Sequence, residues 1–134
     1  MTPGGLDFHL HSTASDGRLH PAALVAHAVA CGVRAMALTD HDTTAGLAAA
    51  AAAAAGLGIA FVPGVEVSAD WRGRSVHVLG LGIDPGAEAL GRGMARQAAE
   101  RERRAREIAR RLDAAGAPGT AALQHVREST SNPT

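Results

Sequence analysis

Short apolar stretches alternate with helical segments in the first half of this 134-residue chain. Four apolar stretches have the length of β-strands: residues 6–10, 33–38, 59–62 and 65–69. Between them, residues 21–30 carry apolar side chains at steps of three and four, and an alanine-rich segment includes residues 48–55. An alternation of strands and helices predicts an α/β fold with a parallel sheet and right-handed crossover connections.

The pattern changes after residue 70. Residues 75–82 predict another strand, which would form a hairpin with 65–69 through a loop of three to five residues. Residues 87–115 are strongly charged, with apolar residues at helical steps, and predict a long amphipathic helix. We therefore expect three regions: a sheet domain over 1–83, a helical insertion over 84–116 and a disordered tail over 117–134.

Histidines and carboxylates occur at or just after the ends of the predicted strands. Because side chains alternate along a strand, His9 and His11 point to the same face as Asp7. The carboxyl ends of parallel strands meet at one edge of a sheet, where working residues gather. Imidazole nitrogens and carboxylate oxygens are ligands for Mn²⁺, Zn²⁺ and Fe²⁺. The predicted metal ligands are His9, His11, Asp16, His41, Glu66 and His77.

Several neighbouring residues have an ordinary interpretation beside a functional one. The segment around His41 could cap the next helix through Asp42 or Thr43, although capping does not explain the histidine. Asp7 and Asp40 could fix imidazole tautomers, or they could form surface ion pairs. The candidate contacts to a substrate phosphate are Ser12, Arg18 and Arg101. Turn bonding is the alternative for the serine, and a helix-face arginine whose stem packs on apolar surface is the alternative for Arg101.

Composition narrows the function classes. The formal net charge is zero, so no overall positive charge attracts phosphate groups. Phosphate binding therefore has to depend on a local group of residues. Aromatic residues make up 2% of the chain, which argues against base-stacking surfaces. The single cysteine, Cys31, fits a reducing compartment, and with no signal-peptide or membrane-span pattern we expect a cytoplasmic protein. Since no G-x-S-x-G motif or P-loop is visible, water activated by metal is the expected nucleophile.

Four motifs in order resemble those of the PHP (polymerase and histidinol phosphatase) family. They are Asp7–Ser12 with Ser15–Gly17, Leu38–Asp42, Pro63–Ser68 and Val76–Gly80. The resemblance covers residues 6 to about 116 and is greatest to stand-alone phosphoesterases that act on nucleoside bisphosphates and short RNA 5′ ends. It implies a partial (β/α)7-type barrel of about three parallel strands plus a hairpin, with a helical insertion.

The resemblance also implies two or three divalent ions, Mn²⁺ first, with Zn²⁺ or Fe²⁺ as alternatives. His9, His11 and Glu66 would hold the first ion, and Asp16 with His41 the second. Glu66 and His77 would hold a third. The resemblance therefore implies a metal-dependent phosphatase of nucleotide monoesters, with histidinol phosphate as the alternative substrate.

The family pattern continues with a further metal-binding histidine and an Asp-x-His pair, which residues 84–134 do not supply. We therefore expect a truncated chain with weak or no activity of its own. The alternatives are a partner chain that completes the barrel and a non-catalytic metal-binding or regulatory remnant.

Overall fold

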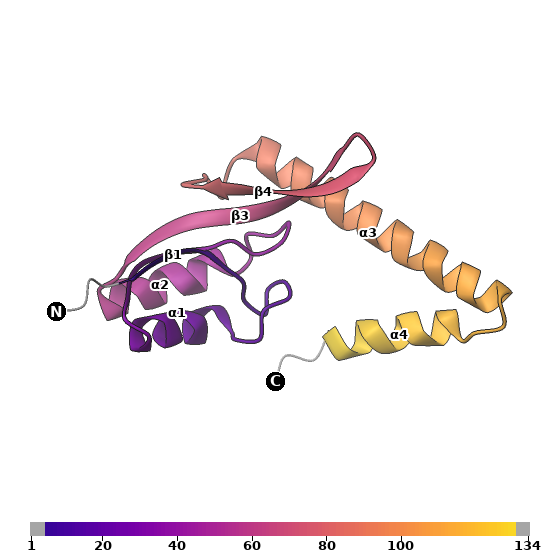
Figure 1. Cartoon of the computed structure of the whole chain (residues 1–134), viewed down its shortest axis with the longest axis horizontal. Coiled ribbons are helices and arrows are strands. Elements are labelled where there is room, and N and C mark those ends of the chain that lie inside the picture. The colour runs from indigo at the N-terminus through magenta and orange to yellow at the C-terminus, as the bar shows by residue number, and fades with distance from the viewer. Residues whose placement is uncertain (1–4, 131–134) are drawn as a thin grey trace. The chain divides into compact units, whose positions relative to one another are not determined.

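The computed structural model describes residues 5–130, with side chains described over 5–128 (Figure 1). The elements are β1 (Gly5–Leu10), α1 (Pro21–Ala30), β2 (Val33–Leu38), α2 (Leu47–Leu57), β3 (Ala60–Trp71), β4 (Arg74–Leu81), α3 (Glu88–Ala114) and α4 (Gly119–Thr130). The chain divides after Met94 into two compact units, which are described separately.

The first unit is built on a four-stranded sheet whose strand order, β1-β2-β3-β4, follows the chain. β1, β2 and β3 are parallel, with α1 and α2 as the crossovers, and β4 returns antiparallel to β3. Figure 1 shows both helices on the same side of the sheet. The predicted α/β fold, part of a barrel with three parallel strands and a hairpin, is confirmed.

The core lies between the two helices and β2. Met36 and Leu38 of β2 are fully buried, and Val25 of α1 packs against them. Ala50 and Ala54 give α2 a smooth face, so this helix approaches α1 and the sheet closely. Burying a side chain the size of methionine or leucine stabilises the fold by about 1.5–3 kcal/mol. The core therefore holds β2, the strand that precedes His41, in place.

β3 runs without a break through Pro63 and Gly64, where the sequence predicts an interruption. Residues 60–63 pair with β2, and residues 64–71 pair with β4. The missing N–H of Pro63 falls where the strand changes partner, and its carbonyl accepts the N–H of Gly82 at 2.8 Å. A Cβ on Gly64 would lie 2.7 Å from the Thr39 side chain, so only glycine fits this crossing point.

The β3–β4 turn is shorter than predicted. Trp71 pairs directly with Arg74, which leaves Arg72 and Gly73 as a two-residue loop instead of three to five residues. Both loop residues have positive φ, 53° and 76°, as tight hairpins with a strong right-handed twist require. The Asp70 carboxylate accepts the N–H of Gly73 at 3.1 Å and stabilises the turn.

In the second unit, α4 corrects the prediction of a disordered tail over residues 119–130. The Asp113 carboxylate at the end of α3 accepts the N–H of Thr120 at 3.1 Å and so caps the first turn of α4. Gly119 approaches α3 so closely that a Cβ would lie 2.1 Å from the carbonyl oxygen of Ala109. Residues 131–134 of the predicted tail lie outside the described residues. The boundary predicted at residues 83 and 84 stays a prediction.

None of the helices between residues 5 and 130 combines the length and the apolar character that crossing a membrane requires.

Candidate metal centre

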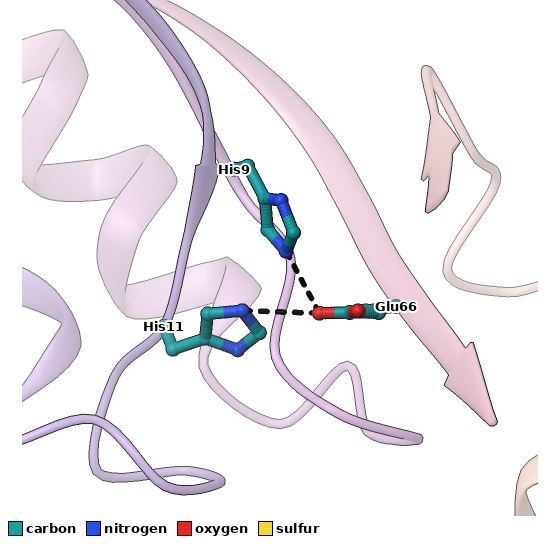
Figure 2. Close-up of side chains that lie close together, drawn as sticks. All are labelled: His9, His11 and Glu66. Carbon is teal, nitrogen blue, oxygen red and sulfur yellow. Dashed lines mark hydrogen bonds and ion pairs between the residues drawn. The ribbon is translucent and has the colours of Figure 1, made fainter. Parts of the chain in front are cut away.

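Four histidines from separate segments surround the carboxylate of Glu66. His9 Nε2 and His11 Nε2 lie 2.8 and 3.1 Å from Glu66 Oε2. Figure 2 shows both rings directed at this carboxylate. His77 Nδ1 lies 3.0 Å from the other oxygen, Oε1. His41 Nε2 completes the ring at 3.7 Å from Oε2. His9 lies in β1 and His11 directly after it, His41 lies three residues after the end of β2, and His77 lies in β4.

Backbone pairing explains why these side chains converge. His9 and His11 lie two residues apart, so they share a face of the chain as β1 ends. The segment after β2 continues alongside β3, because the N–H of Glu66 donates to the Asp40 carbonyl at 3.2 Å. An isolated parallel bridge there joins His41 to Glu66. His77 stands opposite Ser68 in the hairpin, on the same face as Glu66.

A second carboxylate, that of Asp16, stands beside two of the imidazoles. Its oxygens lie 3.5 Å from His11 Nδ1 and 3.6 Å from His41 Nε2. The rings of His11 and His41 are stacked, with centroids 4.6 Å apart. Asp16 itself is exposed and lies in the loop after β1.

The structure therefore brings together all six predicted metal ligands. They form three overlapping groups whose ligand atoms lie within 4.8 Å of one another: His9, His11 and Glu66; His11, Asp16 and His41; His41, Glu66 and His77. Each group contains the ligands that the family resemblance implies for one ion. The assignment of ions to these groups stays a prediction.

The electrostatics of the site suit a cation. Burial, which leaves Glu66 6% exposed, raises the pKa of this carboxyl group, but the hydrogen bond to His9 and the charges of His41, His9 and His11 outweigh burial and lower the pKa overall. Glu66 is therefore ionised at neutral pH. Asp16 adds a second carboxylate to the cluster.

Two buried imidazole nitrogens form no hydrogen bond with the described residues. His11 Nδ1 and His41 Nδ1 are buried and have no hydrogen-bond partner among the described residues; the Asp16 oxygen 3.5 Å from His11 Nδ1 is within ion-pair range only. A buried polar atom without a partner costs about 1–3 kcal/mol. The nitrogen and oxygen donors present thus fit a divalent cation that accepts both.

Asp40 holds the loop that carries Asp16. Asp40 is only 2% exposed. One of its carboxylate oxygens accepts the N–H of Ser12 at 2.7 Å and the hydroxyl of Ser15 at 2.6 Å. The other oxygen accepts the Ser12 hydroxyl at 2.7 Å. Within the described residues Asp40 bonds no imidazole, so its bonds differ from those predicted for fixing a tautomer. The Ser12 hydroxyl donates to Asp40, and its contact to a substrate phosphate stays a prediction.

Asp42, on the other side of His41, binds the backbone of β3, a role that no sequence pattern predicts. It is buried with φ of 48°, and its carboxylate accepts the N–H of Ser68 at 2.7 Å. Its own N–H donates to the Glu66 carbonyl at 2.9 Å. α2 begins later, at Leu47, with no side-chain cap, so the capping role considered for Asp42 is not what the structure shows.

Comparison with known proteins identifies the family. The sequence model of the PHP domain matches residues 7–119. This chain belongs to the PHP domain family. It is 47% identical over 112 residues to a 5′-3′ exoribonuclease of Haemophilus influenzae, covering 84% of this chain and 41% of that protein. It is 49% identical over 114 residues to a 3′,5′-nucleoside bisphosphate phosphatase of Chromobacterium violaceum, covering 85% and 40%.

A solved structure shares the fold of this PHP chain. It is described as a candidate metal-dependent phosphoesterase of Bifidobacterium adolescentis, and it matches with a TM-score of 0.76 and 36% identity over 82% of this chain and 38% of that one. The PHP chain spans about two-fifths of the length of the curated relatives it matches.

The remaining predicted residues lie around or away from the centre. The Asp7 carboxylate accepts the N–H of His9 at 3.3 Å, which makes it a local strand contact. Arg18 is exposed on the loop that carries Asp16. Arg101 belongs to the second unit, so the structure does not relate it to the centre. The phosphate contacts proposed for these arginines stay predictions.

We predict that Glu66→Gln removes more bound metal than the loss of any single histidine. The amide keeps the size of the side chain but removes the negative charge and one of the two ligand oxygens. Elemental analysis of the purified chain after equilibration with Mn²⁺ or Zn²⁺ measures the effect. The control is Glu88→Gln, an exposed carboxylate in the first turn of α3. Unchanged metal content in a folded Glu66→Gln variant would remove Glu66 from the centre.

We predict that Asp40→Ala lowers the free energy of unfolding by about 3 kcal/mol, because a buried N–H and two hydroxyls lose their acceptor. Metal affinity should fall too, since the loop that carries Asp16 is released. Asp84→Ala is the control: its carboxylate accepts only an exposed loop N–H, and the expected change is within about 0.5 kcal/mol. Urea unfolding and a metal titration measure both effects, and equal stability of the two variants would contradict this role of Asp40.

Proposed function

We propose that this PHP chain supplies the metal-binding part of a phosphoesterase that hydrolyses phosphate monoesters of nucleotides. The observation that carries the proposal is the ring of four imidazoles and a second carboxylate around buried Glu66. An exoribonuclease and a nucleoside bisphosphate phosphatase among the relatives of the chain support the reaction class.

Three ligand groups would share the ions. His9, His11 and Glu66 would hold one ion, and Asp16 and His41 a second. Glu66 and His77 would hold a third, so that Glu66 is shared. Divalent ions at such a site acidify water and neutralise charge on phosphoryl oxygens, and Mn²⁺ is the first choice, with Zn²⁺ and Fe²⁺ as alternatives.

The protein's own side chains would position the metal ligands. Glu66, ionised and buried, offsets the positive charge, while Asp40 and Asp42 fix the two segments that carry Asp16 and His41. His9 and His77 are partly exposed and mark the side from which a phosphate ester would approach. Arg18, exposed on the loop of Asp16, is the candidate for a contact to a second phosphate.

The substrate we propose is a 3′,5′-nucleoside bisphosphate or the 5′ end of a short RNA. This class follows the names of the relatives that match over more than four-fifths of the chain. Histidinol phosphate is the alternative, which rests on the family resemblance alone.

Each ligand group among the described residues contains three side chains. We propose that further ligands, from a longer form of the protein or from a partner chain, complete the coordination of the ions. The 134-residue chain by itself would then bind metal weakly and have weak or no activity. A non-catalytic metal-binding remnant is the competing interpretation, and it predicts a single weak ion even in a longer form.

We predict that Mn²⁺ raises the thermal midpoint of the chain, because a ligand at 100 times its dissociation constant stabilises the folded state by about 2.7 kcal/mol. In a longer form, Mn²⁺ should also support hydrolysis of 3′,5′-bisphosphorylated adenosine over histidinol phosphate, and a chelator should abolish it. Phosphate release and a thermal melt measure the two effects. The control variant is His20→Gln, which changes an exposed histidine outside the centre and should behave as the unaltered protein does. A longer form that binds Mn²⁺ but releases no phosphate from either compound would leave only the remnant interpretation.

A further inference from the structure

The apex of the β3–β4 hairpin combines an exposed aromatic ring with two cations. Trp71, the only tryptophan in the sequence, is 62% exposed. The Arg72 guanidinium lies over its ring, 5.2 Å from the centroid, as in a cation–π pair. Arg74, also exposed, stands directly opposite Trp71 in the strand register. None of these residues takes part in the metal centre.

The turn holds its arginine in a conformation that arginine rarely adopts. Arg72 has φ of 53°, in the left-handed region that glycine, asparagine and aspartate occupy more readily in such turns. The two-residue hairpin requires this conformation at its first loop position. Here the conformation belongs to the residue whose guanidinium lies against the indole.

We propose that this apex is a stacking site for one base of a single-stranded RNA, with Arg72 and Arg74 contacting the flanking phosphates. The inference rests on the proposed function and narrows its substrate class. An aromatic face beside cations is the combination with which proteins bind single strands without reading their sequence. The Asp70 carboxylate, which accepts the N–H of Gly73 in the turn, offsets one of the two arginine charges, so the apex keeps a net positive charge that suits phosphate.

The strand register places the apex away from the metal centre. The pair Trp71 and Arg74 lies three residues beyond the pair Ser68 and His77, a distance of about 10 Å along the hairpin. Alternation also turns Trp71 to the face opposite His77. A base stacked on Trp71 therefore belongs to a different nucleotide from the one whose phosphate lies at the metal centre. The stacking site would raise the affinity of the chain for oligonucleotides and leave its affinity for mononucleotides unchanged.

The scarcity of aromatic residues limits the site and makes it easy to test. One indole can stack one base, so no extended stacking surface is implied. Since the chain has one tryptophan and no tyrosine, its intrinsic fluorescence reports on this apex alone. The probe is a short oligoadenylate, titrated into the whole chain with a chelator present so that the RNA stays intact.

We expect saturable quenching of the Trp71 emission by the oligoadenylate, weakened by added salt, with adenosine monophosphate much less effective. In an anisotropy titration with labelled RNA, Trp71→Ala should weaken binding about ten-fold. Arg72→Ala should weaken binding as well and reduce its dependence on salt. Val78→Ala is the matched control, since Val78 is exposed on the same face of β4 but lies away from the apex, and it should bind as the unaltered chain does.

RNA affinity unchanged in Trp71→Ala, or the absence of quenching, would overturn the inference. So would an emission change that follows protein concentration without RNA, because a second copy of the chain would then cover the apex. The result is separable from the proposed function. RNA that binds through Trp71 without any hydrolysis in a longer form would keep the stacking site and refute the phosphoesterase. Hydrolysis that Trp71→Ala leaves unchanged for both RNA and bisphosphate would refute the stacking site alone.

Discussion

A carboxylate buried among four imidazoles constrains the whole first unit. Placing an ionised group away from water is costly unless positive charge or hydrogen-bond donors surround it. Glu66 meets this requirement with side chains from β1, β4 and the ends of β1 and β2. The three parallel strands and the hairpin must therefore keep their register for the carboxylate to stay satisfied, which couples the site to the fold.

The two aspartates that flank His41 connect this cluster to the backbone. Asp40 binds the loop after β1, and Asp42 binds β3, so His41 is held between the two segments that carry the other ligands. Both carboxylates accept hydrogen bonds from backbone N–H groups or hydroxyls. The scaffold of the centre can thus form from the chain's own hydrogen bonds, with the imidazoles already directed at Glu66.

The sequence predicted the parts of the structure that follow from periodicity. Apolar strands, the alanine-rich helix and the rule that working residues gather at strand ends were sufficient to predict the sheet order and the convergence of His41 and Glu66. The features it missed depend on contacts between distant residues. β3 continues through Pro63 because the strand changes partner there, and α4 forms because Asp113 caps it. The left-handed conformation of Asp42 likewise comes from its bonds to Ser68 and Glu66.

Glu66 and the surrounding imidazoles should bind divalent metal together. Diffraction from crystals of the chain equilibrated with Mn²⁺, recorded on both sides of the manganese absorption edge, tests this joint binding. We expect anomalous peaks within coordination distance of Glu66 Oε2, between His9 and His11, and beside Asp16 and His41. Full occupancy by Mn²⁺ elsewhere on the chain, with no peak at Glu66, would contradict it.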